Sequence, residues 1–333
     1  MPDPALSTTP LNQAARPTGV LLINLGSPDA PTPEAVRRYL KQFLSDPAVV
    51  DWPRWLWLPI LHGIILRTRP ARSAALYERV WTDNGSPLID ISQRQAQALQ
   101  RTLGESWRVE CAMRYGNPSV AHGLNTLRDA GCDKIVVLPM FPQECQATTG
   151  SVITELEAVC ETMQDGSGIT VIPGYATDAG YVKAFAATIR ETREAHPDID
   201  HMVFSFHGIP ARLVTAGDPY QEQCEATAHA LAQQLELVDD QWTLVYQSRF
   251  GPEAWLRPYA IEAVPSMATT HRKLLVCCPG FTADCLETID EIGVELRHSF
   301  LKAGGEALVL APCINDRREW IEGMANMVRQ ALP

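Results

Sequence analysis

The sequence lacks the short motifs that mark several common kinds of site. Its nine cysteines include no Cys-x-x-Cys pair, which argues against a zinc ribbon or a conventional iron–sulfur ligand pattern. Neither a G-x-G-x-x-G dinucleotide fingerprint nor a G-x-x-x-x-G-K-[ST] phosphate loop is present. Basic residues are scarce: 28 Lys and Arg stand against 39 Asp and Glu, a formal net charge of −11. We therefore expect no nucleic-acid partner, because phosphate binding needs a basic surface.

The start of the chain lacks an apolar leader segment. Residues 1–17 are polar and proline-bearing, so we expect a disordered tail there. The number of cysteines is odd, and the chain of 333 residues is large for a disulfide scaffold. Reduced thiols in the cytoplasm are the simple interpretation.

Long apolar runs are also missing, with one partial exception at residues 52–72. The apolar part extends from Trp55 to Leu66 and is too short to span a bilayer. Two interpretations stay open. The segment is either a buried helix and turn, or an exposed apolar lip that docks on a membrane surface with arginines at the headgroups. The interrupting residues are Pro59, His62 and Gly63, and the arginines are Arg67, Arg69 and Arg72.

What the sequence does contain is a series of short, continuous apolar runs separated by longer stretches of helical character. This alternation is typical of parallel sheets covered by helices on both faces. We predict an α/β fold of two similar Rossmann-like domains, each with a roughly four-stranded parallel sheet flanked by helices. The runs are 19–28, 108–118, 134–142, 168–175, 201–210, 242–252, 273–281 and 306–313.

The domain limits follow from these runs. We place an N-terminal domain at 18–174, carrying the lip 52–72, and a C-terminal domain at 175–315. A helical segment over 316–333 follows, and we expect it to pack back on the first domain.

Ligands of such sheets bind beyond the carboxyl ends of the strands. His207 lies there, in the stretch VFSFHGIP, after an apolar strand and before the turn residues Gly208 and Pro210. Glycine at this point permits close approach of a ligand or of another backbone. A neutral imidazole is suited to binding a metal or to accepting a proton near neutral pH. The topology brings four further residues to strand ends: Asn24, Arg114, Tyr115 and Gln247.

A row of carboxylates occupies the stretch FTADCLETIDEIGVELRHSF, residues 281–300. On an α-helix, Asp284, Glu287, Glu291 and Glu295 would form one narrow stripe. Two interpretations stay open: a solvated helix face, or a path for a hydrated divalent cation.

Six stretches resemble characteristic blocks of the ferrochelatase family, and they follow one another in the same order. HMVFSFHGIPARLVTAGDPY resembles the family signature, and FTADCLET resembles its second active-site segment. The resemblance covers about residues 18–325 and is greatest to the short, Gram-negative bacterial type. The other four stretches are LLINLGSPDAP, CAMRYGNP, VLPMFPQECQATTGS and YQSRFGPEAWLRP.

The resemblance implies a lyase that inserts Fe²⁺ into protoporphyrin IX, giving protohaem and two protons in the terminal step of haem biosynthesis. It also implies a porphyrin cleft between two domains that bind no nucleotide. By resemblance, His207 and Glu287 are the catalytic residues and the candidate ligands of the metal. The acidic path then comprises Asp284, Glu291 and Glu295, and the residues that contact porphyrin are Leu25, Arg114, Tyr115 and Trp255.

The resemblance carries expectations about cofactors and location as well. Some relatives hold an iron–sulfur cluster through cysteines of a C-terminal extension, whereas here only Cys313 lies near Pro333. We expect no cluster and no permanently bound cofactor, with Fe²⁺ as a substrate. Cys285 stands where some relatives carry histidine, which leaves metal handling there open. Because the implied substrate is apolar, we expect a cytoplasmic protein with peripheral contact to the inner membrane.

Three alternatives remain at this stage. A chelatase of the same scaffold would act on coproporphyrin or load cobalt into another tetrapyrrole. A porphyrin or haem carrier would bind without catalysis, and a periplasmic-type binding protein would require an export signal.

Overall fold

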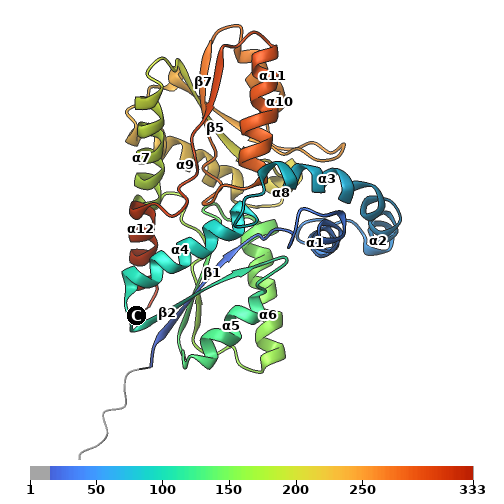
Figure 1. Cartoon of the computed structure of the whole chain (residues 1–333), viewed down its shortest axis with the longest axis vertical. Coiled ribbons are helices and arrows are strands. Elements are labelled where there is room, and N and C mark those ends of the chain that lie inside the picture. Colours follow the sequence, from blue (N-terminus) through green and yellow to red (C-terminus); the bar gives the residue numbers. More distant parts are fainter. Residues whose placement is uncertain (1–15, 333) are drawn as a thin grey trace, which may run out of the picture.

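Two four-stranded sheets with the same strand order form the centre of the molecule. The computed structural model describes residues 16–332 (Figure 1). The first sheet has the order β2-β1-β3-β4 and the second β6-β5-β7-β8, and all neighbouring strands are parallel. The predicted fold class is thereby confirmed. The strands are β1 Thr18–Asn24, β2 Trp107–Met113, β3 Ile135–Pro139, β4 Ile169–Val171, β5 His201–His207, β6 Trp242–Gln247, β7 Lys273–Cys277 and β8 Ala307–Leu310.

The central strands are buried on both faces, as their continuous apolar sequence predicts. Val20 and Ile23 of β1 and Val203 and Phe204 of β5 have no exposed surface. Each of the eight predicted runs contains one strand. The strands are shorter than the runs because the small and proline residues at the run ends lie in turns beyond the ladder.

Helices cover both sheets and also form a separate projection. The predicted α-helical geometry is wrong at one place, because residues 287–296 form a π-helix, η4, and not an α-helix. The helices are α1 Pro33–Ser45, α2 Arg54–Ile60, η1 Leu61–Ile65, α3 Leu66–Val80, α4 Pro87–Leu103, α5 Val120–Asp129, η2 Gln146–Gly150, α6 Ser151–Met163, α7 Ala179–Ala195, α8 Ala211–Thr215, α9 Tyr220–Gln234, η3 Asp239–Gln241, α10 Ala260–Met267, η4 Glu287–Leu296, α11 Arg297–Lys302 and α12 Arg318–Gln330.

The last helix joins the two halves. In Figure 1, α12 lies beside α7 and α4 at the edge of the molecule. Trp320 of α12 is fully buried, and its ring packs against Tyr175 and Tyr181. One apolar cluster continues from the first sheet through this contact into the second. The domain limits near residue 174 remain a prediction, and the tail expected over 1–17 lies outside the described residues apart from Arg16 and Pro17.

The loops after β1 and β2 interlock at the carboxyl edge of the first sheet. The Leu25 carbonyl accepts a hydrogen bond from the Tyr115 N–H at 2.9 Å. Gly26 has φ +113°, and a Cβ atom there would lie 1.8 Å from the Tyr115 carbonyl oxygen. Only glycine fits this turn, which explains the turn stretch LGSP and fixes the two loops side by side.

The segment 52–72 projects from the body as α2, η1 and the start of α3 (Figure 1). One face is buried, with Trp57 and Leu61 packed in a cluster around α1. The other face is exposed: Trp55 at 78%, Ile64 at 57% and Leu56 at 41%. The segment therefore has one buried and one exposed apolar face, and its docking on a membrane stays a prediction. Within residues 16–332, no helix combines the length and the apolar character that crossing a bilayer requires.

Candidate functional site

His207 is the last residue of β5, opposite Gln247 of β6 in the ladder. Its Nδ1 lies 2.7 Å from the Gly208 carbonyl oxygen. Because a carbonyl oxygen only accepts hydrogen bonds, Nδ1 must carry the proton. The lone pair of the neutral ring is then on Nε2, which has no hydrogen bond to any residue in 16–332. The backbone thus presents a half-buried imidazole as a base or a ligand.

Gly208 permits a close contact between this strand end and the loop 248–258. A Cβ atom at position 208 would lie 3.0 Å from the Gln247 carbonyl oxygen and 3.1 Å from the Trp255 ring. The backbone of Pro210 pairs with that of Trp255. As a result, the ring centroids of Trp255 and His207 are 6.3 Å apart. The structure therefore brings together these two residues that the sequence assigned to the site.

Glu287 is the first residue of η4, and a buried amide fixes its backbone. The Gln247 side chain donates from Nε2 to the Glu287 carbonyl at 2.9 Å. Its Oε1 accepts a hydrogen bond from Ser205 Oγ at 2.7 Å. The start of η4 is thereby bonded to both β5 and β6. Wide helical turns of this kind occur frequently at functional sites.

The four carboxylates of the predicted stripe have different surroundings. Glu291 accepts two hydrogen bonds from Ser248, from the backbone N–H at 2.7 Å and from Oγ at 2.6 Å. Asp284 accepts from Asn315 Nδ2 at 2.7 Å and from the Cys313 N–H at 3.2 Å, which ties down the loop before α12. Glu295 is exposed. Of the four carboxylates, Glu291 is the one whose pKa the His207 ring affects, and Glu287 acts on Glu291.

The electrostatics link these three groups. Burial raises the pKa of Glu291, and the Glu287 carboxylate raises it further, whereas the Ser248 hydrogen bonds and the His207 ring lower it. Glu287 also reaches the other half. After burial, its charge is the next cause that raises the pKa of the Tyr77 hydroxyl in α3. This pair of carboxylates therefore interacts electrostatically with His207 of the second half and with α3 of the first half, which packs against η4.

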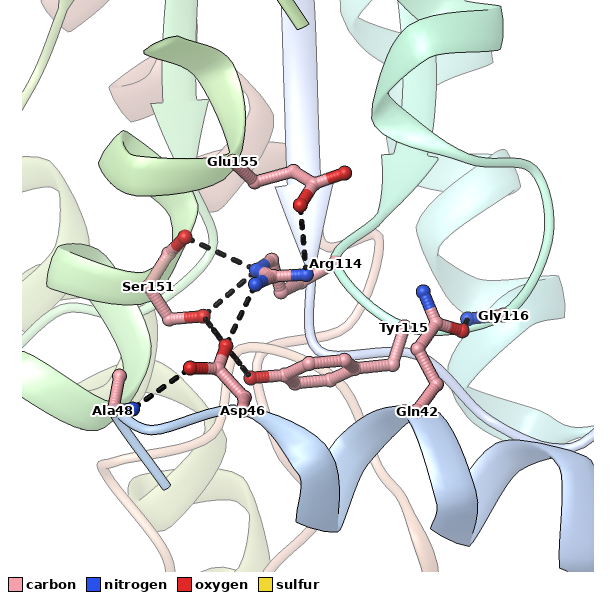
Figure 2. A network of polar contacts seen from close by, with 8 residues as sticks. All are labelled: Gln42, Asp46, Ala48, Arg114, Tyr115, Gly116, Ser151 and Glu155. Carbon is pink, nitrogen blue, oxygen red and sulfur yellow. Dashed lines mark hydrogen bonds and ion pairs between the residues drawn. The ribbon is translucent and has the colours of Figure 1, made fainter. Parts of the chain in front are cut away.

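Arg114 and Tyr115 directly follow β2, and both belong to a network of polar contacts (Figure 2). The Asp46 carboxylate accepts from Arg114 at 2.6 Å, from Tyr115 Oη at 2.8 Å and from Ser151 Oγ at 2.7 Å. It also accepts from the Ala48 N–H at 2.7 Å. Tyr115 has 0% exposed surface. The Arg114 side chain keeps 11% of its surface exposed, and the porphyrin contacts expected of both residues stay predictions.

This network depresses the pKa of Asp46. Burial alone would raise it, but the hydrogen bonds from Ser151, Tyr115 and the Ala48 N–H, together with the Arg114 charge, lower it overall. Asp46 is also the residue at which α1 ends. The network therefore fixes where the chain leaves α1 and enters the projecting segment.

Arg69 lies near Glu287, although the sequence presents it only as one of three arginines at the end of an apolar segment. Burial lowers the pKa of its guanidinium, whereas Tyr77 and Glu287 raise it. The guanidinium lies 5.1 Å from the centre of the Phe250 ring, and it forms no ion pair within residues 16–332. A partly desolvated cation without an ion pair is suited to an anionic ligand. The signal in the sequence was an arginine at the end of an apolar segment, which does not reveal burial.

Leu25 is partly buried against the cluster around α1, at the carboxyl end of β1. It lies on the opposite half from Trp255, because the two residues follow strands of different sheets. The carboxyl ends of the two sheets thus each carry one of the apolar residues predicted to contact porphyrin.

The donors available for a metal are sparse. Among the described residues, no group of three or more His, Cys, Asp or Glu side chains could hold a metal ion. All nine cysteines are unpaired thiols, and burial raises the pKa of Cys278, Cys285 and Cys313 well above the usual value. The absence of an iron–sulfur cluster remains a prediction.

Known proteins resemble this chain over nearly its whole length. A family profile described as Ferrochelatase matches residues 17–332. Ferrochelatase 1 of Shewanella oneidensis is 46% identical over 94% of this chain and 95% of the relative. The ferrochelatase of Methylococcus capsulatus is 48% identical over 92% of this chain and 94% of the relative. Among solved structures, SirB from Bacillus subtilis with Fe³⁺ matches with a TM-score of 0.53 at 14% identity, covering 95% of both chains.

Proposed function

This chain belongs to the ferrochelatase family, and on that premise we propose how its residues carry out the family's reaction. The chain is a lyase that inserts Fe²⁺ into protoporphyrin IX for haem synthesis, giving protohaem and two protons. The observation that carries the proposal is the free Nε2 of His207, whose ring lowers the pKa of the Glu291 carboxylate, while Glu287 at the start of the same helix raises that pKa.

The chemistry requires two tasks of the protein. A free-base porphyrin has two N–H groups that point into a planar hole, so a metal cannot enter until both protons leave. A bent macrocycle exposes its nitrogen lone pairs on one face. A rigid apolar cleft that binds the bent form better than the flat form lowers the barrier. A base must then accept the protons as the metal arrives.

His207 and Glu287 are the proposed proton acceptors. Nε2 of His207 takes one pyrrole proton, and the Glu291 carboxylate stabilises the imidazolium that forms. Glu287 takes the second proton, and both groups return their protons to solvent. The two charges left on the porphyrin nitrogens are balanced by Fe²⁺, so the step conserves charge. Before insertion, the carboxylates of Glu287 and Glu291 offer oxygen ligands to Fe²⁺.

The walls of the cleft are proposed to be Leu25 on one half, Trp255 on the other and the projecting segment over residues 52–66. Protoporphyrin IX carries two carboxylates, and Arg69 is the proposed partner for one of them because its guanidinium is buried without an ion pair among the described residues. Arg114 and Tyr115 act through the loops that they support.

The weak donor set suits a substrate metal, because three or four strong ligands would retain Fe²⁺. We propose no resident cofactor.

The exposed apolar face of 52–72 is proposed to contact the inner membrane from the cytoplasmic side. Trp52, Trp55, Leu56 and Ile64 supply the apolar surface, and Phe250 is exposed beside Arg69. Aromatic and basic residues together are typical of proteins that lie on a bilayer surface. Both porphyrin and haem are apolar, so docking there shortens their path through water.

The test is an anaerobic absorbance assay with Fe²⁺ and protoporphyrin IX. We expect the His207→Ala variant to lose about 100-fold or more in kcat, the usual contribution of a positioned acid–base group. Glu287→Gln should show a loss of at least about tenfold, and Glu295→Gln, on the same helix but exposed, should leave kcat unchanged.

Two outcomes would contradict the proposal. If His207→Ala turned over as fast as the control His122→Ala, at an exposed histidine, then His207 would not be the proton acceptor. If Glu287→Gln and Glu295→Gln changed kcat equally, the row of carboxylates would be a solvated helix face without a specific role. Absorbance spectra with coproporphyrin and with Co²⁺ in the same assay measure the substrate preference.

A further inference from the structure

Arg212 binds two carboxylates that belong to distant parts of the chain. Its NH1 and NH2 groups donate to Asp51 Oδ2 at 2.5 Å and to Asp51 Oδ1 at 2.6 Å, a bidentate arrangement. Its Nε donates to Glu253 Oε1 at 2.5 Å. The three side chains lie at the surface, each between 35% and 44% exposed.

The three residues stand at three edges of the proposed cleft. Asp51 directly precedes Trp52, the first residue of the projecting segment. Glu253 lies two residues before Trp255 in the loop 248–258. Arg212 is in α8, which follows the His207 turn. One guanidinium therefore joins three parts of the chain: the segment 52–72, the loop 248–258 (the tryptophan loop) and the turn 208–210 after His207 (the histidine turn).

Backbone bonds already attach two of these edges to each other. The Ala211 N–H donates to the Ala254 carbonyl at 3.0 Å, and the Leu256 N–H donates to the Ile209 carbonyl at 3.0 Å. The histidine turn and the tryptophan loop thus form one unit. Asp51 belongs to the other half, at the start of the projecting segment. Among residues 16–332, Arg212 is the only residue that forms an ion pair with Asp51.

The other end of the segment also contacts the second half. Arg69 lies over the Phe250 ring at 5.1 Å, and further along α3 Arg79 pairs with the buried Asp290 of η4 at 3.3 Å. The segment is therefore held at both ends, by Arg212 at its start and by α3 at its finish.

We propose that Arg212 is a positioning residue that sets the width of the porphyrin cleft, by holding Asp51 and Glu253 together across its mouth. It touches neither His207 nor the carboxylates of η4, so it acts on binding and not on the proton transfers. A protein whose binding-competent form is less populated binds its ligand more weakly in proportion. This inference rests on the proposed function, since it assumes that the cleft between the segment and Trp255 takes the porphyrin.

The experiment compares Arg212→Ala, Arg212→Lys and the control Arg318→Ala, which removes an exposed arginine paired with Glu322 on α12. We expect Arg212→Ala to raise the KM for protoporphyrin and the Kd from fluorescence titration by about three- to tenfold, with kcat within about twofold. Lysine keeps the positive charge but cannot bind Asp51 bidentately and Glu253 at once. Arg212→Lys should therefore show a smaller increase in KM and Kd than Arg212→Ala. Raising NaCl from about 50 to 500 mM should weaken binding by the wild type more than by Arg212→Ala, because salt screens exposed charges.

The proposal is overturned if KM and Kd of Arg212→Ala match those of Arg318→Ala at every salt concentration. It is also overturned if kcat changes while KM does not, because Arg212 would then act in the chemistry or in product release. Failure of the proposed function itself looks different: the wild type would not insert iron, whatever residue stands at position 212.

Discussion

At the scale of single residues, local hydrogen bonds decide which atoms are available for chemistry. The Gly208 carbonyl holds the proton on Nδ1 of His207 and leaves Nε2 free. Ser248 holds Glu291 with two donors, from a backbone at φ +64° that is rare for a residue with a side chain. Such strain persists where surrounding contacts fix it, and here it presents both donors to one carboxylate. The proton affinity of the site is therefore set by neighbours of the reacting groups.

Ser248→Ala tests this control of proton affinity. The hydroxyl bond lowers the pKa of Glu291, so removing it should raise that pKa further above the ordinary glutamate value of 4.5. A carboxylate with a higher pKa becomes protonated at a higher pH and then cannot stabilise the His207 imidazolium. We expect the acid limb of the kcat/KM profile to move to higher pH. Ser266→Ala, an exposed serine of α10, is the control. A profile that coincides with the wild type would contradict the role of Glu291.

At the scale of elements, the end of α1 and the start of α6 are joined through one carboxylate. Asp46, at the end of α1, accepts hydrogen bonds from the loop after β2 and from Ser151 of α6 (Figure 2). Glu155, one turn further along α6, pairs with Arg114 at 3.2 Å. Breaking a buried pair is costly because the remaining charge loses its partner. The network thus fixes the base of the projecting segment.

Asp46→Asn should destabilise the protein by about 1–3 kcal/mol at neutral pH, since one amide oxygen cannot replace the carboxylate for all its donors. The folded pKa of Asp46 lies below its usual 3.8, so its stabilisation is present above that pH and is lost as the pH falls through the folded value. The difference between variant and wild type should therefore shrink at low pH. Urea unfolding at several pH values measures it, with the exposed Asp29→Asn as the reference. A difference independent of pH would show that the charge of Asp46 is not the cause.

At the scale of the whole molecule, two sheets have the same strand order, and one segment of the first half contacts the second half. Arg212, Arg69 and Arg79 hold that segment against the second half. Its outer face keeps Trp55 and Ile64 exposed. Exposed apolar clusters beside a binding cleft are typical of surfaces with a partner, and a bilayer is the partner that fits arginines and tryptophans.

The variants Trp55→Ser and Leu56→Ser should reduce co-sedimentation with anionic vesicles by about tenfold when combined, because each removes apolar surface that would enter the bilayer. Ile261→Ser, at a residue 70% exposed on α10, is the matched control and should bind as the wild type does. Iron insertion into detergent-solubilised porphyrin should stay unchanged. Unaltered vesicle binding by the double variant would remove the membrane proposal.

The sequence determined much of this protein by itself. Continuous apolar runs determined eight buried parallel strands, because a strand covered on both faces has no polar side. The length of those runs and the turn residues after them placed His207 at a strand end. The motif blocks identified the family, since long stretches of specific residues in order do not recur by chance.

Only the tertiary structure decided which of these residues can act. The acidic row looked uniform, but folding separates Glu291 beside His207 from Asp284 in a loop and from exposed Glu295. Tyr115 follows a strand toward the cleft and yet is fully buried. Arg212 pairs with Asp51 across 161 positions of sequence. Hydrogen bonding, burial and distant charge pairs depend on distances in space, and the order of residues along the chain does not contain them.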